Sequence, residues 1–538
     1  MQGRPSSIWR GAVVAAVAVA CLLAVWSVAE GWQWSLGRLT STGCEEEALF
    51  PIWKAATGQA VYADADQMPF SASYYNWLFY AVYGGVVRGV LAVTHLGTDA
   101  LPAIARMITV GFSAACVAMI YLLLQTLKPG GLAGSRFGRL ACSVFLMVNP
   151  LTGPWLYTAR PDLAALLCEL IGLWFALRHV RDGNRGHLVL AVAAGLLAWS
   201  FKQNFVHLLG GLCVFFLLRR QWKDLLAVTA ISVVVASGTL WIGGGAYRHA
   251  LIGAQLNCQV SAESAWMLFQ QATANAPQLV ALAAGLIIIL LLRTRWRPAP
   301  AVELLTAVSL VAFGIGALGI SKQGADTNYF IPASVLGMIW CLSLHREDTS
   351  WPVEARRGVN FLHWSGVAAA GVAVAAGLWP QIGRSSEAVT RIVHARSVEA
   401  KPAALASELD ILKRHLRELP GPIFVTDRAC NLPWIQPKAP HFVYSFMYAL
   451  DKKSGHSVEG GGIGGLIEAG YFETVVVLDR DCACESPERE AKQCSHVTMN
   501  HLPMVRDGPV PSIDGGRMTR YAFAFQDGLF QYYRKRGK

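Results

Sequence analysis

Ionisable side chains gather at a few points where long apolar stretches of the sequence begin or end. Three consecutive carboxylates, Glu45, Glu46 and Glu47, lead into the apolar segment ALFPIWKAATG. Another acid, Asp162, lies at the boundary between two later apolar stretches. A carboxylate in such a place can remove the proton of an acceptor hydroxyl as a general base. Each of these four residues is therefore a candidate for catalysis.

Basic and amide side chains occur at similar boundaries. Arg160 lies close to Asp162, and Lys202 with Gln203 interrupts a further apolar run. Fixed cations stabilise the charge that develops on a departing phosphate, so the set suits transfer from a lipid phosphate or pyrophosphate-like leaving group. The other polar candidates for substrate binding are Asp64, Asp326, Asn328 and Tyr329.

Each cluster also has a purely structural interpretation. The three glutamates suit a helix N-terminus, where acids interact favourably with the helix dipole. Asp162 suits a helix cap or a local pair with Arg160, and Lys202 suits a side chain that reaches lipid phosphates. Asp326 and Asn328 suit a turn. The functional interpretation depends on their joint occurrence, because ionisable groups at membrane depth are costly and usually functional.

The composition indicates how these residues are positioned. Of the 538 residues, 54% are hydrophobic and only 15% are charged, whereas soluble domains carry about 25% charged residues. The apolar residues form runs long enough to cross roughly 30 Å of hydrocarbon. We therefore expect a polytopic membrane protein and exclude a single soluble enzyme. The net charge of +11 resides mainly in short loops that set orientation, so nucleic acid is not an expected partner.

About eleven transmembrane helices are predicted. They cover residues 9–29, 102–126, 139–157, 163–179, 187–200, 204–219, 224–243, 276–292, 301–320, 329–344 and 360–380. The aromatic stretch 74–97 is assigned to the membrane interface instead, because it contains a Gly84–Gly85 break and Arg88, and because five basic loops then fall inside. This topology places the C-terminus and all candidate clusters outside.

From residue 381 the sequence is typical of a soluble α/β domain. Residues 398–418 have helical periodicity, and 422–427 and 474–480 have the pattern of buried strands. The glycine-rich loop Gly460–Gly465 lacks the Lys-Ser/Thr ending of a nucleotide-binding P-loop. We therefore expect domains at 1–380 and 381–538.

A group of cysteines marks the second half of this domain. Cys482, Cys484 and Cys494 lie near His496. In an oxidising compartment this spacing favours a disulfide, which could also involve Cys430, over free thiols or a metal site.

The order of these motifs resembles a known family. EEEALF and IWKAATGQAVYADAD, followed by an aromatic segment, resemble the first outer loop of the membrane-embedded GT-C glycosyltransferases. ARPD at 159–162, KQ at 202–203 and DTNYFIP at 326–332 are similar to further elements of its bacterial branch. That branch includes aminoarabinose and lipopolysaccharide-core transferases and relatives of protein mannosyltransferases. The resemblance implies a GT-C-like, α-helical polytopic membrane protein with a catalytic first outer loop at 30–100.

The resemblance also implies roles for single residues. The Asp-Glu-Ala motif of the family falls on Glu46-Glu47-Ala48, which makes Glu46 the candidate base. Because the family usually has Asp there, Glu45 and Glu47 stay open for that role. Asp162 matches a second outer carboxylate, and Lys202 matches a basic residue near the lipid phosphate. Some members bind a divalent metal, but no ligand set here is specific enough to predict one.

The sequence thus predicts an inverting glycosyltransferase at the outer face of a bacterial inner membrane, with a periplasmic C-terminal domain. The expected partners are a polyprenyl-phosphate-linked sugar donor, a cell-envelope glycan or lipid acceptor, and membrane lipids. The alternatives are a transporter or flippase for lipid-linked saccharides, and an inactive relative acting as an assembly subunit. The enzyme is favoured because the predicted spans are apolar, with Arg106, Glu169 and Glu303 as the main exceptions.

Overall fold

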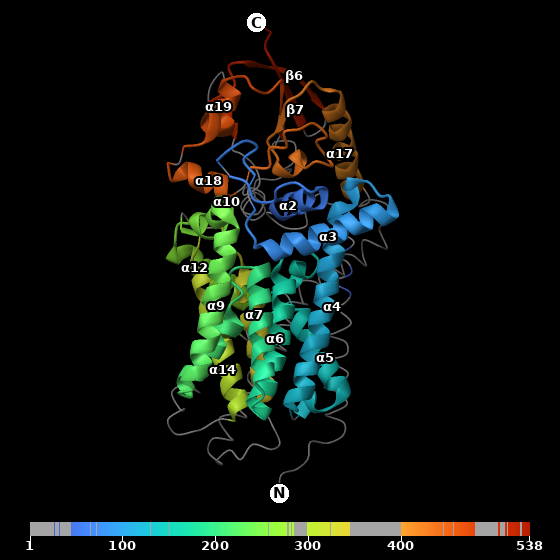
Figure 1. The fold of residues 1–538 in the computed structure, drawn as a ribbon. Coiled ribbons are helices and arrows are strands. Elements are labelled where there is room, and N and C mark those ends of the chain that lie inside the picture. The colour runs from blue at the N-terminus through green and yellow to red at the C-terminus, as the bar shows by residue number, and fades with distance from the viewer. Residues whose placement is uncertain are drawn as a thin grey trace.

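The computed structural model describes residues 45–344, 400–478 and 504–537, together with Trp26, Ala29 and Trp32. Within these ranges it leaves out 65, 72, 130, 150, 257, 277–278, 281, 284–298, 323, 445, 456, 506–511, 514 and 528–529. A bundle of long helices forms one half of the molecule, and a mixed domain of helices and strands lies on one end of it (Figure 1). We call this end of the bundle the domain end.

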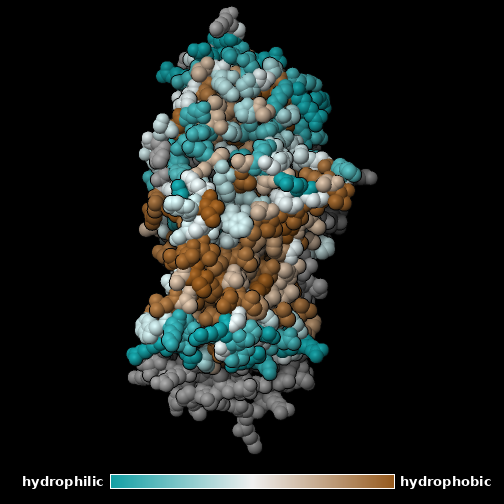
Figure 2. All heavy atoms as spheres, in the orientation of Figure 1, coloured by the Kyte–Doolittle hydropathy of each residue, from teal (hydrophilic) through white to brown (hydrophobic). Residues whose placement is uncertain are grey.

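The bundle helices match the predicted spans closely. They are α4 (Leu101–Leu127), α5 (Arg136–Met147), α6 (Asp162–Asp182), α7 (Arg185–Phe201), α8 (His207–Leu218), α9 (Trp222–Ile242), α14 (Pro300–Gly319) and α15 (Ile331–Ser343). Four of them, α4, α6, α9 and α14, are long and apolar enough to cross a membrane. On the face shown in Figure 2, hydrophobic residues form a band across the bundle. The predicted spans 9–29, 276–292 and 360–380 lie wholly or largely outside the described residues.

One predicted span is wrong in its length. Residues 139–157 do not form one helix, because α5 ends at Met147 and the short helix η3 (Gly153–Leu156) follows. The side chain of Asn149 accepts hydrogen bonds from the backbone N–H groups of Leu151 and Thr152 and so forms a turn.

Two helices cover the domain end of the bundle. Helix α2 (Glu46–Thr57) packs on α3 (Trp77–Thr94), and α3 lies across the bundle rather than within it (Figure 1). Helix α3 is also long and apolar enough to span, so its assignment to the membrane interface stays a prediction. The predicted break at Gly84 is absent, since α3 continues through it. A Cβ on Gly84 would come 2.4 Å from the Cβ of Ala55, so this glycine allows α2 and α3 to approach closely.

A series of short helices follows α9 at the domain end of the bundle (Figure 1). It consists of α10 (Gly244–Arg248), the π-helix η4 (His249–Gly253), α11 (Ala254–Leu256) and α12 (Ala262–Asn275). His249 Nε2 lies 2.8 Å from Asp451 Oδ2 in the C-terminal domain. This part of the chain therefore contacts the domain directly.

The C-terminal domain has the α/β character that the sequence predicts. It contains α17 (Ala400–Glu418), β1 (Ile423–Val425), η6 (Arg428–Asn431), α18 (Phe446–Lys453), η7 (Glu459–Gly461), α19 (Gly462–Glu468), β2 (Thr474–Leu478), β3 (Met504–Val505), β4 (Ser512–Ile513), β5 (Gly516–Arg517), β6 (Tyr521–Asp527) and β7 (Phe530–Lys535). One sheet has the order β1-β2-β7-β6, and β3, β4 and β5 form another. Strands β1 and β2 are parallel. The predicted helix and both predicted strands are confirmed.

The glycine-rich loop has a packing function. A Cβ on Gly516 in β5 would come 2.0 Å from the carbonyl oxygen of Gly464 in α19. The two backbones therefore touch, and only glycine allows that approach. Within the run itself, a Cβ on Gly465 would come 2.1 Å from the Gly460 carbonyl oxygen, so packing accounts for this glycine of the run.

The loop that follows α2 packs into the C-terminal domain. Phe70 is fully buried, with its ring centroid 5.1 Å from that of Tyr448 in α18. Glu459 accepts a hydrogen bond from the Met68 N–H at 2.8 Å and donates its own N–H to the Asp66 carbonyl. The hydrophobic core of the domain thus includes a residue far outside 381–538.

The cysteine prediction is partly tested. Cys482, Cys484 and Cys494 lie outside the described residues, as does His496. Cys430 is a buried free thiol, so the suggestion that it joins a disulfide is wrong. Cys430 packs in η6 with Leu416, Ile423 and Ile435 in a buried hydrophobic cluster, where a thiol acts as a small apolar side chain.

Candidate active site

The first turn of α2 places two adjacent carboxylates beside one guanidinium. Glu46 and Glu47 are almost completely buried, and so is Arg428 from η6. Arg428 Nη2 lies 3.0 Å from Glu46 Oε1, while Nη1 contacts Glu47 Oε1. The Arg428 guanidinium also lies over the ring of Tyr444, 5.6 Å from its centroid. One cation from the C-terminal domain therefore holds both acids.

Burial sets the protonation of Glu46. Desolvation raises the pKa of this carboxyl from 4.5 to about 7, against the attraction of Arg428, and the charges of Glu47 and Asp427 raise it further. Both Glu46 carboxylate oxygens are buried without a hydrogen-bond donor in the described structure. Oε1 is in ionic contact with Arg428, whereas Oε2 has no hydrogen bond in the described structure. A base with a pKa near neutrality and such an oxygen is well suited to accept a proton.

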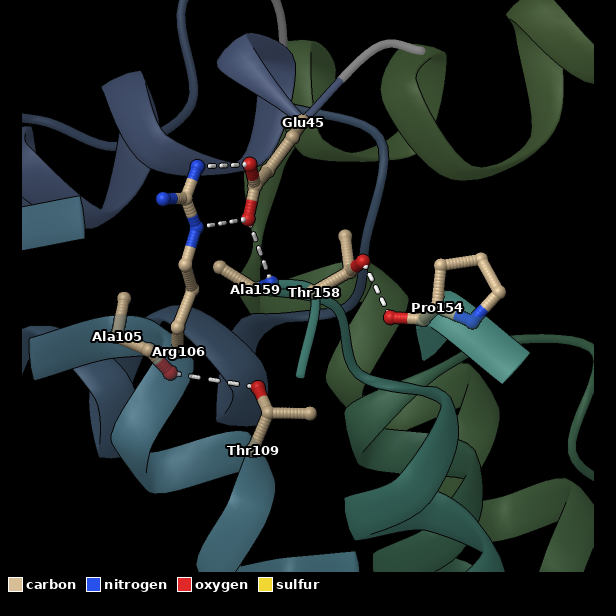
Figure 3. Close-up of polar contacts among 7 residues, drawn as sticks. All are labelled: Glu45, Ala105, Arg106, Thr109, Pro154, Thr158 and Ala159. Atoms are coloured by element: carbon tan, nitrogen blue, oxygen red, sulfur yellow. Dashed lines mark hydrogen bonds and ion pairs between the residues drawn. The ribbon is translucent and has the colours of Figure 1, made fainter. Parts of the chain in front are cut away.

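Glu45 has a different environment from its two neighbours. Its carboxylate accepts from Arg106 of α4 at both oxygens, with distances of 3.1 Å and 2.7 Å, and from the Ala159 N–H at 2.9 Å (Figure 3). Both side chains of the pair are almost fully buried. Three directed bonds satisfy this carboxylate, and they attach the start of α2 to the bundle. This geometry favours a structural role for Glu45.

A second polar cluster forms where α6, α7 and η5 (Thr327–Phe330) meet. Asp162 begins α6 and Lys202 directly follows α7. Lys202 Nζ donates to Asp162 Oδ1 at 2.7 Å, and Asn328 Nδ2 donates to the same oxygen at 2.9 Å. All three side chains are buried. The fold thus brings together three residues that lie far apart in the sequence.

Aromatic rings surround the Lys202 ammonium. It lies 5.3 Å from the ring centroid of Tyr329, 5.8 Å from that of Phe205 and 6.0 Å from that of Tyr75. Rings at these distances attract a cation through their negative faces. The other Asp162 oxygen, Oδ2, is buried without a hydrogen-bond partner in the described structure. The cluster therefore combines a held cation with an aromatic wall.

Arg160 and Gln203 flank this cluster. The Arg160 guanidinium lies 4.8 Å from the ring centroid of Trp155, whereas the ion pair of Asp162 is made with Lys202. The local Arg160–Asp162 pair considered from the sequence is therefore replaced by a pair between two helices. Gln203 donates to the Tyr74 carbonyl at 2.9 Å and fixes the chain just before α3.

Two predicted substrate-binding residues occupy turns. Asp64 is exposed and accepts a hydrogen bond from the Asp66 N–H at 3.0 Å. Asp326 caps η5 by accepting from the Thr327 N–H at 2.6 Å. Short acids commonly make such bonds in turns and at helix starts. These contacts account for both residues structurally.

Sequence reasoning missed two buried cations, Arg428 beside the carboxylates and Lys54 in the same helix as Glu46. Arg428 follows β1 directly after Asp427, at the carboxyl end of a parallel strand, where functional groups often gather. Lys54 lies in α2, donates to the Ser71 hydroxyl at 2.9 Å, and burial lowers its pKa to about 8. Within the part of the chain that the structure describes, no group of three or more His, Cys, Asp or Glu side chains has the arrangement of a metal site.

Comparison with known proteins agrees with this architecture. No family model and no curated protein matches the chain. Among solved structures, ArnT from Cupriavidus metallidurans in the apo state matches with a TM-score of 0.51 and 14% identity, covering 98% of each chain. A likeness at this identity concerns the fold. The GT-C-like fold expected from the sequence resemblance is confirmed: the chain has the fold of ArnT.

Proposed function

We propose that the protein is an integral membrane glycosyltransferase that uses a polyprenyl-phosphate-linked sugar donor. The acceptor is a cell-envelope glycan or lipid, and transfer takes place at the outer face of a bacterial inner membrane. The single observation that carries the proposal is the buried Glu46 carboxylate, whose pKa of about 7 suits a general base. The fold of ArnT, a GT-C glycosyltransferase, supports the same class of reaction.

The proposed reaction is one displacement at the anomeric carbon of the donor sugar. Glu46 accepts the proton of the acceptor hydroxyl, and the hydroxyl oxygen attacks the anomeric carbon. The bond from that carbon to the phosphate oxygen breaks, and the polyprenyl phosphate leaves with the electron pair. A single attack from the face opposite the leaving group inverts the anomeric configuration.

Lys202 is the proposed contact for the donor phosphate. It follows α7 at the domain end of the bundle and pairs with Asp162, two residues after Arg160. The phosphate of a membrane-held lipid would rest there at headgroup depth. Asp162 and Asn328 position the ammonium. Lys acts as a point charge toward phosphate, whereas Arg160 offers a bidentate fork. Both charges would stabilise the leaving polyprenyl phosphate.

The pairing of the polar residues in the bundle favours the enzyme over a transporter or flippase. Arg106 pairs with Glu45, Glu169 accepts from the His207 and Leu208 N–H groups at the start of α8, and Glu303 lies 3.2 Å from Arg219. Each of these three ionisable side chains within otherwise apolar helices thus bonds to a residue of another element. A substrate path through the bundle needs polar groups that are open to the substrate.

The test is a transfer assay with the full-length protein in vesicles. Membranes that contain the protein, extracted polyprenyl-phosphate sugars and envelope glycans are incubated together, and products are identified by mass spectrometry. We expect a sugar to move to the glycan or lipid fraction with wild-type protein and at least about a hundredfold more slowly with Glu46→Gln, the scale of general-base loss. Equal turnover by both proteins would reject Glu46 as the base.

A further inference from the structure

Arg428 lies in the C-terminal domain but points into the carboxylate pair of α2. Its helix, η6, is fixed to the end of β1 by the side chain of Asn431. That amide accepts from the Val425 N–H at 3.1 Å and donates to the Val425 and Asp427 carbonyls at 2.6 Å and 3.0 Å. Asp427 caps the same helix through the Ala429 N–H at 2.8 Å. The backbone that carries Arg428 is therefore rigidly placed.

We propose that Arg428 is a positioning residue, supplied by the C-terminal domain, that assembles Glu46 and Glu47 into the working carboxylate pair and controls the protonation of Glu46. The proposal deepens the proposed function, because it assumes that Glu46 accepts a proton during transfer. Its geometry is independent of that assumption. The two terminal nitrogens of one guanidinium contact one carboxylate each.

The arrangement follows from the cost of burying like charges. Two adjacent carboxylates repel each other and lose hydration when buried. A guanidinium presents several donors in a fixed fork and can therefore serve two acids at once, whereas an ammonium is a single point of charge. The charged groups that face Glu46 are Arg428 and Asp427 from η6 and Glu47 from its own helix. Arg428 is the one cation among them.

The same contact links domain docking to the chemistry. Phe70, from the loop after α2, is buried in the core of the C-terminal domain. Glu459 of that domain accepts a hydrogen bond from the Met68 N–H on the same loop. Asp451 of the domain contacts His249 in η4. In this docked arrangement Arg428 contacts both carboxylates, so the C-terminal domain supplies the cation of the cluster.

Infrared spectroscopy of the purified full-length protein tests this proposal without a substrate. The carboxyl C=O band of Glu46 is assigned as the band that is lost in Glu46→Gln, and its midpoint is followed by pH titration. In Arg428→Met we expect the midpoint to rise by roughly 1–3 pH units, the effect of a nearby opposite charge. In Glu47→Gln it should fall, because a like charge is removed. The control is Arg414→Met, an exposed arginine of α17.

The outcomes separate the proposal from the proposed function. An unchanged midpoint in folded Arg428→Met would overturn it, whatever Glu46→Gln does to transfer. If Arg428→Met does not fold, Arg428→Lys takes its place. A midpoint that lies above the wild-type value, by less than the roughly 1–3 pH units expected for complete loss of the cation, supports the fork. A midpoint equal to that of the wild type in Arg428→Lys would overturn the need for two contacts. Loss of transfer in Arg428→Met that is smaller at higher pH also supports it, whereas a purely structural arginine predicts equal loss at every pH.

Discussion

Replacing Glu46 with glutamine is expected to stabilise the protein while abolishing its activity. The side chain is almost fully buried, and burial raises its pKa from 4.5 to about 7. One pKa unit corresponds to about 1.36 kcal/mol. The ionised carboxylate therefore costs the folded protein roughly 3 kcal/mol, and the neutral amide of glutamine removes that cost.

The stability difference has a definite pH dependence. The pKa of Glu46 is higher in the folded protein than in the unfolded chain, so folding takes up protons between pH 4.5 and about 7. The free energy of unfolding of the wild type therefore falls as the pH rises through that window. Glutamine does not titrate. The variant should match the wild type below pH 4.5 and exceed it by roughly 3 kcal/mol above pH 7.

Thermal unfolding of the full-length protein in detergent at about pH 5 and about pH 8 measures this difference. The Tm of Glu46→Gln should exceed that of the wild type mainly at the higher pH, and transfer should be at least about a hundredfold slower. Glu418→Gln, an exposed carboxylate of α17, is the control and should show no such pH dependence. A Tm difference that is the same at both pH values, or a less stable variant at the higher pH, would refute the reasoning.

Three further predictions concern the rest of the site and the topology. Arg106→Met should lower the free energy of unfolding by about 3–5 kcal/mol, because it leaves Glu45 buried and unpaired, and Glu45→Gln/Arg106→Met should unfold at a higher temperature than Arg106→Met alone. Lys202→Met should weaken binding of a polyprenyl-phosphate sugar in a vesicle assay by at least about tenfold, whereas Lys202→Arg should retain most of it; equal affinity in both would place the phosphate elsewhere. A topology reporter fused after residue 134 should lie in the cytoplasm and one after residue 538 in the periplasm, and a periplasmic signal at 134 would contradict the interfacial position of α3.

Much of the fold could be predicted because most bundle helices are long runs of predominantly apolar residues. Helices α4, α6 and α9 begin and end within a few residues of the predicted spans, since hydropathy marks the hydrocarbon limits directly. The error at α5 arose because a short apolar turn, satisfied by the Asn149 side chain, has the same hydropathy as a helix. The pattern of apolar residues does not reveal hydrogen bonds within a turn.

The candidate site was predictable only in part. Residue type and position made Asp162, Lys202 and the three glutamates candidates, because ionisable groups at membrane depth are costly, and only the family resemblance singled out Glu46. Their partners were not predictable, since Asp162 pairs with Lys202 across two helices rather than with its sequence neighbour. Arg428 lies 382 positions after Glu46 in the numbering, 428 against 46, and nothing in its local sequence indicates that contact. Tertiary packing alone decides which distant charges meet.

The central claim is that this protein moves a sugar from a polyprenyl phosphate to the cell envelope, with Glu46 as the base. The most direct measurement is mass spectrometry of polyprenyl-phosphate sugars and envelope glycans from a deletion strain that expresses either the wild type or Glu46→Gln. With the variant, one polyprenyl-phosphate sugar should accumulate, and one sugar should be missing from an envelope glycan or lipid. Identical glycans and identical lipid-linked sugars in the two strains would contradict the claim.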